Sequence, residues 1–373
     1  MYRLPAEWEP QSGVQLTWPH VGTDWAPMLD EVTETYRQIA SEIERREPLL
    51  IVAPEGTNVG RPFFACPTDD TWARDHGFIT LVNNNSSLLL DFQFNGWGRK
   101  FPAEQDNAIN RHLYEAGLLQ GKYVDYLDFV LEGGSIESDG QGTIFTTTGC
   151  LMAKNRNQPL NKYEIEERLK RYLYADRILW IDYGQLTGDD TDGHIDTLVR
   201  ICPDDTLVYV GCDDPADEQY EELRLMEEQL RTFRTKDNRP YRLLRLPLPR
   251  PIYDDEQQPE QQEQCEPART LPSHEKLRER LRVGASAGMG DRTSGIGQRQ
   301  SQRLPATYAN FLVVNGAVLC PTYDQPDLDS EALSIIGEAF PGRDIVGIDC
   351  RPLIRQHGSL HCCTMQFPAD VLR

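Results

Sequence analysis

The sequence predicts an α/β fold in which pairs of short strands alternate with single helices. Apolar residues recur at near-helical spacing in several segments, such as residues 30–47, where Val32, Tyr36 and Ile39 share one face. Short apolar runs that fit buried strands, such as residues 49–53, lie between these segments. The pattern recurs every 60–75 residues or so, which suggests repeated supersecondary units of roughly that length, although no repeat is visible in the residues themselves.

Taken in chain order, each apolar run of strand length is followed by turn residues or by a longer amphipathic segment. The predicted strands cover residues 14–18, 49–53, 78–82, 87–92, 143–148, 177–181, 197–202, 206–211, 243–248, 311–314, 317–319 and 344–348. The predicted helices cover residues 30–47, 106–117, 162–174, 217–231 and 330–340. The pairs 78–82 with 87–92 and 197–202 with 206–211 are close enough in sequence to form hairpins. Strand pairs that alternate with helices are typical of the α/β class.

We expect one domain over residues 1–373, interrupted by a poorly ordered insertion at residues 254–302. The insertion begins with the acidic, Gln-rich run DDEQQPEQQEQCEP and ends with GASAGMGDRTSGIGQRQSQ. Low hydrophobicity with many Gly, Ser and Gln residues favours a surface segment that does not join the core. A catalytic lid is the alternative interpretation, because long loops in compact domains are either functional or disordered.

Composition limits the class of protein and its partners. The 39% hydrophobic content is enough for a buried core, but no stretch reaches the roughly 18–20 apolar residues that span a bilayer. The N-terminal residues lack the pattern of a secretory signal, so a cytoplasmic location is expected. The nine cysteines form no CxxC pair and no regular spacing, which argues against a disulfide framework. The net charge of −21 argues against a nucleic-acid partner.

Four segments combine charged or nucleophilic side chains with turn residues. They are residues 71–77 (TWARDHG), 131–135 (LEGGS), 189–196 (DDTDGHID) and 358–364 (GSLHCCT). The first three lead into predicted strands, and the fourth lies near the end of the chain. Loops at strand ends can present such side chains to a common site, so these segments are the candidates for chemistry.

The segment 189–196 is the most informative of the four. If a strand starts at Gly193, His194 and Asp196 point to the same face, because side chains alternate along a strand. An imidazole beside a carboxylate is a general acid/base whose charged form is favoured. A surface strand end with a satisfied histidine is one alternative. A metal site of His194, Asp196, His361 and a cysteine is another, but we expect no metal because no compact ligand set is visible.

Two adjacent cysteines, Cys362 and Cys363, offer a nucleophile. A thiolate forms near neutral pH only in an electropositive, partly exposed environment, which a histidine elsewhere in the chain can supply. In an extended tail the two side chains would face opposite ways, so at most one could share a site with a given neighbour. The local pattern does not distinguish them, and an inert buried thiol is the ordinary alternative for each.

Together these motifs resemble the agmatine deiminase family, which includes the bacterial type of peptidyl-arginine deiminase. The resemblance runs through PAEWEPQSGVQLTWPH, DDTWARDHG, FNGWGRKFP, LEGGSIESDGQGT, TDGHID, LPATYANFLVVNGAVLCPTY and SLHCCTMQ. It implies the pentein fold, a five-bladed α/β propeller of ββαβ-type units around a central active site. The chain departs from the family in the insertion and in the residues 356–361, where the family has more glycines.

The resemblance also implies a role for each matching residue. It makes Cys362 the nucleophile, His194 the general acid/base and Glu132 the acid that assists it. Asp75 and Asp196 match the carboxylates that hold a guanidinium, and Trp72 matches an aromatic wall of the pocket. Charge-assisted hydrogen bonds from paired carboxylates suit the planar, permanently charged guanidinium.

The implied reaction is the hydrolysis of agmatine to N-carbamoylputrescine and ammonia through a Cys-linked thiouronium, without a cofactor, as part of putrescine and polyamine biosynthesis. We expect Trp97 to be a further substrate-binding residue. Peptidyl members use an arginine pair in this region, where this chain has only Arg99, so agmatine is favoured over a C-terminal arginine. Asp190 could bind the distal amine, although a solvated acidic turn explains it equally well. The alternatives are a peptidyl-arginine deiminase, a metal hydrolase and an inactive guanidine-binding pentein, and a homodimer or larger assembly is expected.

Overall fold

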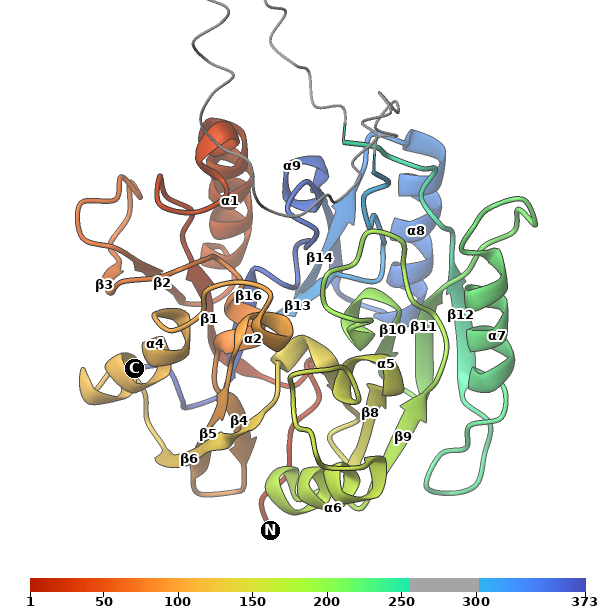
Figure 1. Cartoon of the computed structure of the whole chain (residues 1–373), viewed down its shortest axis with the longest axis horizontal. Helices are drawn as coiled ribbons and strands as arrows, with labels where there is room; N and C mark the ends of the chain where they lie inside the picture. The colour runs from red at the N-terminus through yellow and green to blue at the C-terminus, as the bar shows by residue number, and fades with distance from the viewer. Residues whose placement is uncertain (255–301) are drawn as a thin grey trace, which may run out of the picture. The chain divides into compact units, whose positions relative to one another are not determined.

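The structure, a computed structural model, describes residues 1–254 and 302–373. All strands in these ranges belong to five small β-sheets (Figure 1). Met1–Ile252 and Arg303–Arg373 form one compact unit. The insertion predicted at residues 254–302 lies outside the described residues, apart from its first and last.

Each sheet repeats one plan, in which two antiparallel strands are followed by a helix and by a third strand parallel to the second. The sheet of β4 (Ile79–Val82), β5 (Ser87–Gln93) and β6 (Lys122–Val130) shows it clearly, with α4 (Asp106–Glu115) between β5 and β6. Two parallel neighbours need a crossover connection, and the helix supplies it.

Three further sheets follow the same plan in chain order. Their elements are β7 (Ile136–Ser138), β8 (Thr143–Thr147), α6 (Lys162–Leu173) and β9 (Arg177–Ile181); β10 (Val199–Cys202), β11 (Thr206–Val210), α7 (Tyr220–Leu230) and β12 (Arg242–Leu246); and β13 (Leu312–Val314), β14 (Ala317–Thr322), α8 (Pro326–Ala339) and β15 (Asp344–Asp349). In each case the first two strands pair antiparallel and the last two pair parallel.

The fifth sheet joins the two ends of the chain. β16 (Thr364–Pro368) pairs antiparallel with β1 (Gln11–Thr17), with Gln11 opposite Pro368. The helix α1 (Leu29–Glu44) then leads to β2 (Leu49–Ala53), which runs parallel to β1, and β3 (Phe64–Ala65) extends this sheet at its edge. The five ββαβ-type units expected from the resemblance are therefore confirmed, with the fifth unit assembled from both termini.

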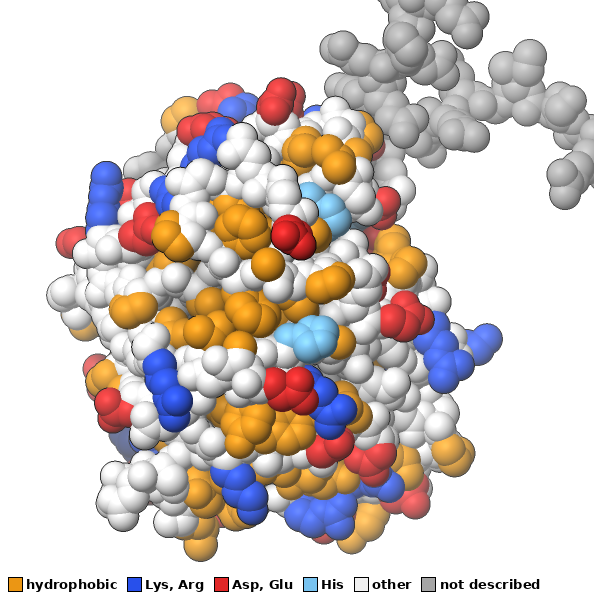
Figure 2. Space-filling model, turned by 90° about the vertical axis from the view of Figure 1, so that its left-hand side faces the viewer, with side chains coloured by type: hydrophobic (Ala, Val, Ile, Leu, Met, Phe, Trp, Pro, Cys, Tyr) orange, Lys and Arg blue, Asp and Glu red, His pale blue; other side chains and the backbone are white. Residues whose placement is uncertain are grey.

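The helices α1, α4, α6, α7 and α8 lie on the outside of the strands (Figure 1). Each turns an apolar stripe inward, and in α1 this stripe includes the fully buried Val32, Tyr36 and Ile39. None of the helices in the described ranges is long and apolar enough to cross a membrane. On the face drawn in Figure 2, acidic and basic side chains are interspersed with apolar ones, so the negative charge does not gather there in a single patch.

Candidate active site

Every unit carries a polar side chain just before its first strand, and these five positions meet. Asp75 lies in the short helix α2 (Ala73–His76), which precedes β4 and lies near the centre of Figure 1. Glu132 precedes η2 (Gly133–Ser135) and β7, while His194 and Asp196 lie at η3 (Ile195–Thr197) before β10. Asn310 stands two residues before β13, and Cys362 stands two residues before β16.

Gly134 shows how closely three of these positions approach one another. A Cβ atom at residue 134 would lie 2.7 Å from His194 Nδ1, 2.9 Å from Asp75 Oδ1 and 3.1 Å from Asp196 Oδ2. The Gly134 amide also donates a hydrogen bond to Asp75 Oδ1 at 3.1 Å. Packing therefore excludes a side chain at residue 134, which explains a glycine at this position of the LEGGS segment.

Asp75 is buried and accepts a second hydrogen bond, from Trp97 Nε1 to its Oδ2 at 2.9 Å. Trp97 adopts a left-handed backbone conformation with φ of 53°, which is uncommon for a large side chain. Burial, reinforced by the nearby Asp196 charge, raises the pKa of Asp75 to about 6, although His194 and Trp97 act in the opposite direction. A cation bound beside Asp75 would lower this pKa and favour the ionised carboxylate.

Asp196 is fully buried, yet its pKa lies below the usual range of an aspartate. Burial is the largest influence and raises this pKa, but the hydrogen bond from His361 Nδ1 to Asp196 Oδ2, at 2.7 Å, and the charges of His361, His194 and Arg200 together outweigh it. The other oxygen, Oδ1, has no hydrogen-bond partner among the described residues. Asp196 thus offers a free, ionised oxygen at the site.

Cys362 lies beside both carboxylates, with its Sγ 4.0 Å from Asp196 Oδ2. The side-chain oxygen of Asn310 accepts from the Cys362 thiol at 3.4 Å and from the Cys362 amide at 3.3 Å. Burial raises the pKa of the Cys362 thiol well above its usual value, and the charges of Asp196 and Asp75 raise it further. Cys363 instead faces the Tyr36 hydroxyl in the core, so the structure separates the two thiols.

His194 stands against Asp75, with 3.6 Å between its Nδ1 and Asp75 Oδ1, and neither ring nitrogen has a hydrogen-bond partner among the described residues. Burial is the largest influence and disfavours the charged ring, but Asp75, Cys150 and Glu132 together outweigh it, and the pKa of His194 is raised well above its usual value. Glu132 is held by Arg156 Nε at 2.9 Å, and its second oxygen is also unpartnered in the described part of the chain.

One group of possible metal ligands occurs at this place within the described ranges. Glu132, Cys150 and His194 bring one ligand atom each to within 4.8 Å of one another. This set differs from the alternative set of His194, Asp196, His361 and a cysteine, in which His361 is taken up by hydrogen bonds instead. Cys150 is a buried thiol that the sequence motifs did not point to.

The structure has no strand at Gly193, and the strand predicted for residues 197–202 begins two residues later. Residues Ile195–Thr197 form a 3-10 turn, and β10 begins only at Val199. His194 and Asp196 still enter the same site, but they face different partners, Asp75 and His361. The left-handed Gly193, with φ of 90°, begins this turn, which a strand could not accommodate.

A cavity of about 40 Å³ opens next to the thiol, and the predicted binding residues Trp72, Trp97 and Asp190 line it together with Asp75 and Cys362. Its remaining lining is Asp24, Asp70, Phe101, Thr191, Gln356, His357 and Gly358, so no Lys or Arg occurs among the described lining residues. The Trp72 indole donates to Asp70 Oδ2 at 3.0 Å, and Gly358 lies flat against its ring, where a Cβ atom would come within 2.2 Å of Cζ3. Arg99 is exposed and does not line the cavity.

Several residues of the site were missed by sequence reasoning, namely Asn310, Arg156, Asp24 and Asp70, while His361 was considered only as a metal ligand. Asn310 could have been found from its position, because it precedes the first strand of its unit as Cys362 does. Arg156 carries no such signal, since it reaches Glu132 from a loop and also pairs with Asp192.

Known proteins are similar to this chain over nearly its whole length. A family model described as Porphyromonas-type peptidyl-arginine deiminase matches residues 3–368. An agmatine deiminase of Pseudomonas aeruginosa is 30% identical, over 99% of this chain and 96% of its own length. The solved "Putative Arginine Deiminase" from Porphyromonas gingivalis is 44% identical, with a TM-score of 0.84 and full coverage of both chains. A Cys-to-Ser variant of C. jejuni agmatine deiminase with substrate bound is 34% identical, with a TM-score of 0.81 over 100% of this chain and 98% of that chain.

Proposed function

The chain belongs to the Porphyromonas-type peptidyl-arginine deiminase family, and we propose that it is an agmatine deiminase, which hydrolyses agmatine to N-carbamoylputrescine and ammonia. Relatives named agmatine deiminase match the chain over almost its full length. The observation that carries the choice of substrate is the cavity beside Cys362, whose described lining holds four aspartates and no Lys or Arg. Such a lining suits a molecule that is cationic at both ends.

The two buried carboxylates suit the guanidinium end. Asp196 Oδ1 lacks a partner in the described part of the chain, and Asp75 is held in a fixed orientation by Trp97 and Gly134. Charge-assisted hydrogen bonds to these oxygens would fix the guanidinium plane with its carbon near the thiol. Holding the reacting atoms in this orientation raises the rate of the attack, because the reaction becomes effectively intramolecular.

Burial and the neighbouring carboxylates hold the pKa of the Cys362 thiol well above its usual value, which favours the protonated thiol. A bound guanidinium opposes the charges of Asp75 and Asp196 and so removes part of this effect, which makes the thiolate easier to form. The thiolate then attacks the guanidinium carbon, and the bond from that carbon to an amino group breaks.

His194 is the candidate proton carrier, with Glu132 and Asp75 beside it. In the first step the protonated His194 ring gives its proton to the leaving amino group, which departs as ammonia and leaves a thiouronium on Cys362. In the second step His194 removes a proton from water, which attacks the same carbon, and the carbon–sulfur bond breaks to return the thiol. The product is a ureido group, so atoms and charge balance without a redox partner.

The distal end of the substrate distinguishes agmatine from arginine. Agmatine ends in an ammonium group, whereas a free or C-terminal arginine carries a carboxylate that Asp24, Asp70 and Asp190 would repel. The indoles of Trp72 and Trp97 border the space between the two ends and can cover the apolar butyl chain.

A colorimetric assay for ureido products tests the proposal on agmatine, free arginine and a peptide that ends in arginine, with and without a chelator. We expect turnover of agmatine that the chelator leaves unchanged. Cys362→Ala should abolish turnover, while Cys363→Ala, the matched control, should retain it because Cys363 faces the core. Activity on the peptide without activity on agmatine would refute the choice of substrate. A cytoplasmic location and a homodimer or larger assembly belong to the same proposal, and light scattering of the purified protein measures the latter.

A further inference from the structure

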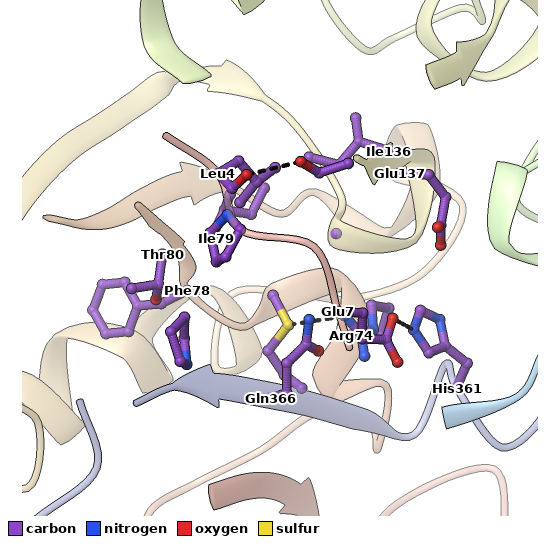
Figure 3. A pocket seen from close by; sticks show the side chains of 15 residues that line it. Leu4, Glu7, Arg74, Phe78, Ile79, Thr80, Ile136, Glu137, His361 and Gln366 are labelled. Atoms are coloured by element: carbon purple, nitrogen blue, oxygen red, sulfur yellow. Dashed lines mark hydrogen bonds and ion pairs between the residues drawn. The ribbon is translucent and has the colours of Figure 1, made fainter. Parts of the chain in front are cut away.

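The His361 imidazole lies between two carboxylates directly behind the nucleophile. Its Nδ1 is 2.7 Å from Asp196 Oδ2, and its Nε2 is 2.8 Å from Glu7 Oε2. A dashed line in Figure 3 marks the contact with Glu7. The side chain is 2% exposed, and the reaction described above assigns it no proton transfer or bond change.

The direction of the Asp196 contact follows from the chemistry of the two groups. An ionised carboxylate can only accept hydrogen bonds, so Nδ1 must carry the hydrogen and donate it to Asp196. The opposite side of the ring is fixed by Glu7, whose Oε2 also accepts from Arg200 Nη2 at 2.6 Å. Arg200 in turn donates to Glu137 Oε1 at 2.6 Å. The orientation of the imidazole is therefore determined from both sides.

We propose that His361 is a positioning residue, which holds Asp196 ionised and turned so that the oxygen Oδ1 stays free for the guanidinium of the substrate. The inference rests on the proposed function for its substrate, but its structural part concerns Asp196 alone. Asp196 Oδ2 accepts a hydrogen bond from His361 Nδ1, and Asp196 Oδ1 has no partner in the described residues. A carboxylate that is free to rotate would offer either oxygen, and a protonated one would not hold a cation.

Charged groups from several elements face Asp196, and they do not all favour its ionised form. Arg200 of β10, Arg74 of α2 and His194 favour the charge, whereas Asp75 opposes it, and the Cys362 thiol lies alongside. Burial raises the pKa of Asp196, and among the influences that lower this pKa the hydrogen bond from His361 is the largest. Without this donor, Asp196 would take up a proton at a higher pH.

Two substitutions at this position separate the two hydrogen bonds of the ring. In His361→Asn the side-chain amide can occupy the place of Nδ1 and donate to Asp196, whereas in His361→Gln the longer side chain reaches toward Glu7. We expect the agmatine KM to rise about 10-fold or less in His361→Asn and about 100-fold in His361→Gln, because hydrogen bonds to charged groups are strong. In the wild type we expect Asp75 to set the acid side of kcat/KM. In His361→Gln the protonation of Asp196 should add to it, so that the fall moves to higher pH, and kcat should change less than KM.

Matched controls separate positioning from folding. His112 is exposed on α4, and His112→Asn should keep the KM and the pH profile. Thermal midpoints of both His361 variants establish that the proteins compared are folded. Equal changes in KM for the two variants, with an unchanged pH profile, would mean that His361 only fills space and would overturn the inference.

A second measurement does not depend on the substrate. In protein labelled with ¹⁵N-histidine, His361 should show a hydrogen-bonded Nδ1–H, identified by its absence from the spectrum of His361→Asn. A ring that carries hydrogen only at Nε2 would also overturn the inference. An inactive wild-type protein that retains the Nδ1–H signal would instead contradict the choice of agmatine, so the two failures can be told apart.

Discussion

Asn310 provides the sharpest test of the site, because one amide oxygen holds the nucleophile segment in place. Asn310 Oδ1 accepts from the His361 amide at 2.9 Å, from the Cys362 amide at 3.3 Å and from the Cys362 thiol at 3.4 Å. In Asn310→Ala the Cys362 amide loses this acceptor, while the His361 amide keeps the Asn310 backbone oxygen at 3.1 Å. One buried donor without a partner costs about 1–3 kcal/mol, and the lost packing brings the expected destabilisation to about 2–4 kcal/mol.

Asn310→Asp separates the charge of this position from its shape. It retains an acceptor oxygen but places a negative charge near the thiol and loses the donor to the Asp196 backbone oxygen, which lies 3.4 Å away. A third carboxylate beside Cys362 raises the thiol pKa further. A rise of about two units lowers the thiolate fraction about 100-fold, so kcat/KM should fall by a similar factor.

Urea unfolding followed by tryptophan fluorescence measures the first effect, and the ureido-product assay measures the second. Asn157→Ala is the matched control, because Asn157 is a buried amide that bonds both backbone groups of Val130 away from the thiol. It should lose stability while keeping kcat close to that of the wild type. If Asn310→Asp retained kcat/KM within twofold, or if Asn310→Ala were as stable as the wild type, this reasoning would be refuted.

Two further substitutions test the role of Asp190 in the cavity lining and the role of Arg156 as the partner of Glu132. Asp190→Asn should raise the agmatine KM up to about fivefold without changing kcat, because a charge that is 41% exposed is screened by water. An unchanged KM would favour the solvated-turn interpretation of Asp190. Arg156→Met should destabilise the protein by about 3–5 kcal/mol and lower kcat, because it leaves Glu132 buried without its partner. Urea unfolding measures the loss of stability, and steady-state kinetics measure kcat. An unchanged kcat would show that Glu132 acts without the Arg156 ion pair.

The fold was predictable wherever an element buries a continuous apolar surface. The strands β2 and β9 have the predicted bounds, and α6 differs by one residue at its end. β6 was missed because its residues KYVDYLDFV have charges at every third position and lie at the edge of a sheet, half exposed, so no alternation marks them as a strand. β16 was missed because its residues TMQFP include polar side chains and a proline, and because its partner, β1, lies at the other end of the chain.

Site residues that belong to the sequence motifs were predictable. Residues whose role depends on contacts with distant parts of the chain were less so. Asp75, Glu132, His194, Asp196 and Cys362 were each named from the sequence, and the structure brings all five together. Asn310 was missed because one polar residue in an apolar segment gives no local sign of a role. The same limit applies to His361, whose function depends on Glu7, more than three hundred residues away.

The two carboxylates that we propose to hold the guanidinium, Asp75 and Asp196, differ in pKa. We therefore expect only one of them to control the acid side of the pH profile. Burial raises the pKa of Asp75 to about 6, whereas His361 holds that of Asp196 below its usual range. As the pH falls through about 6, Asp75 becomes neutral while Asp196 stays charged, so kcat/KM should fall there. Trp97→Phe keeps the ring but removes the donor to Asp75, and it should move this fall upward by about 0.5–1 unit. Trp72→Phe removes a donor to Asp70 instead, so the pH at which kcat/KM falls should not change in this variant. Equal shifts of this pH in both variants would mean that Asp75 does not control the acid side.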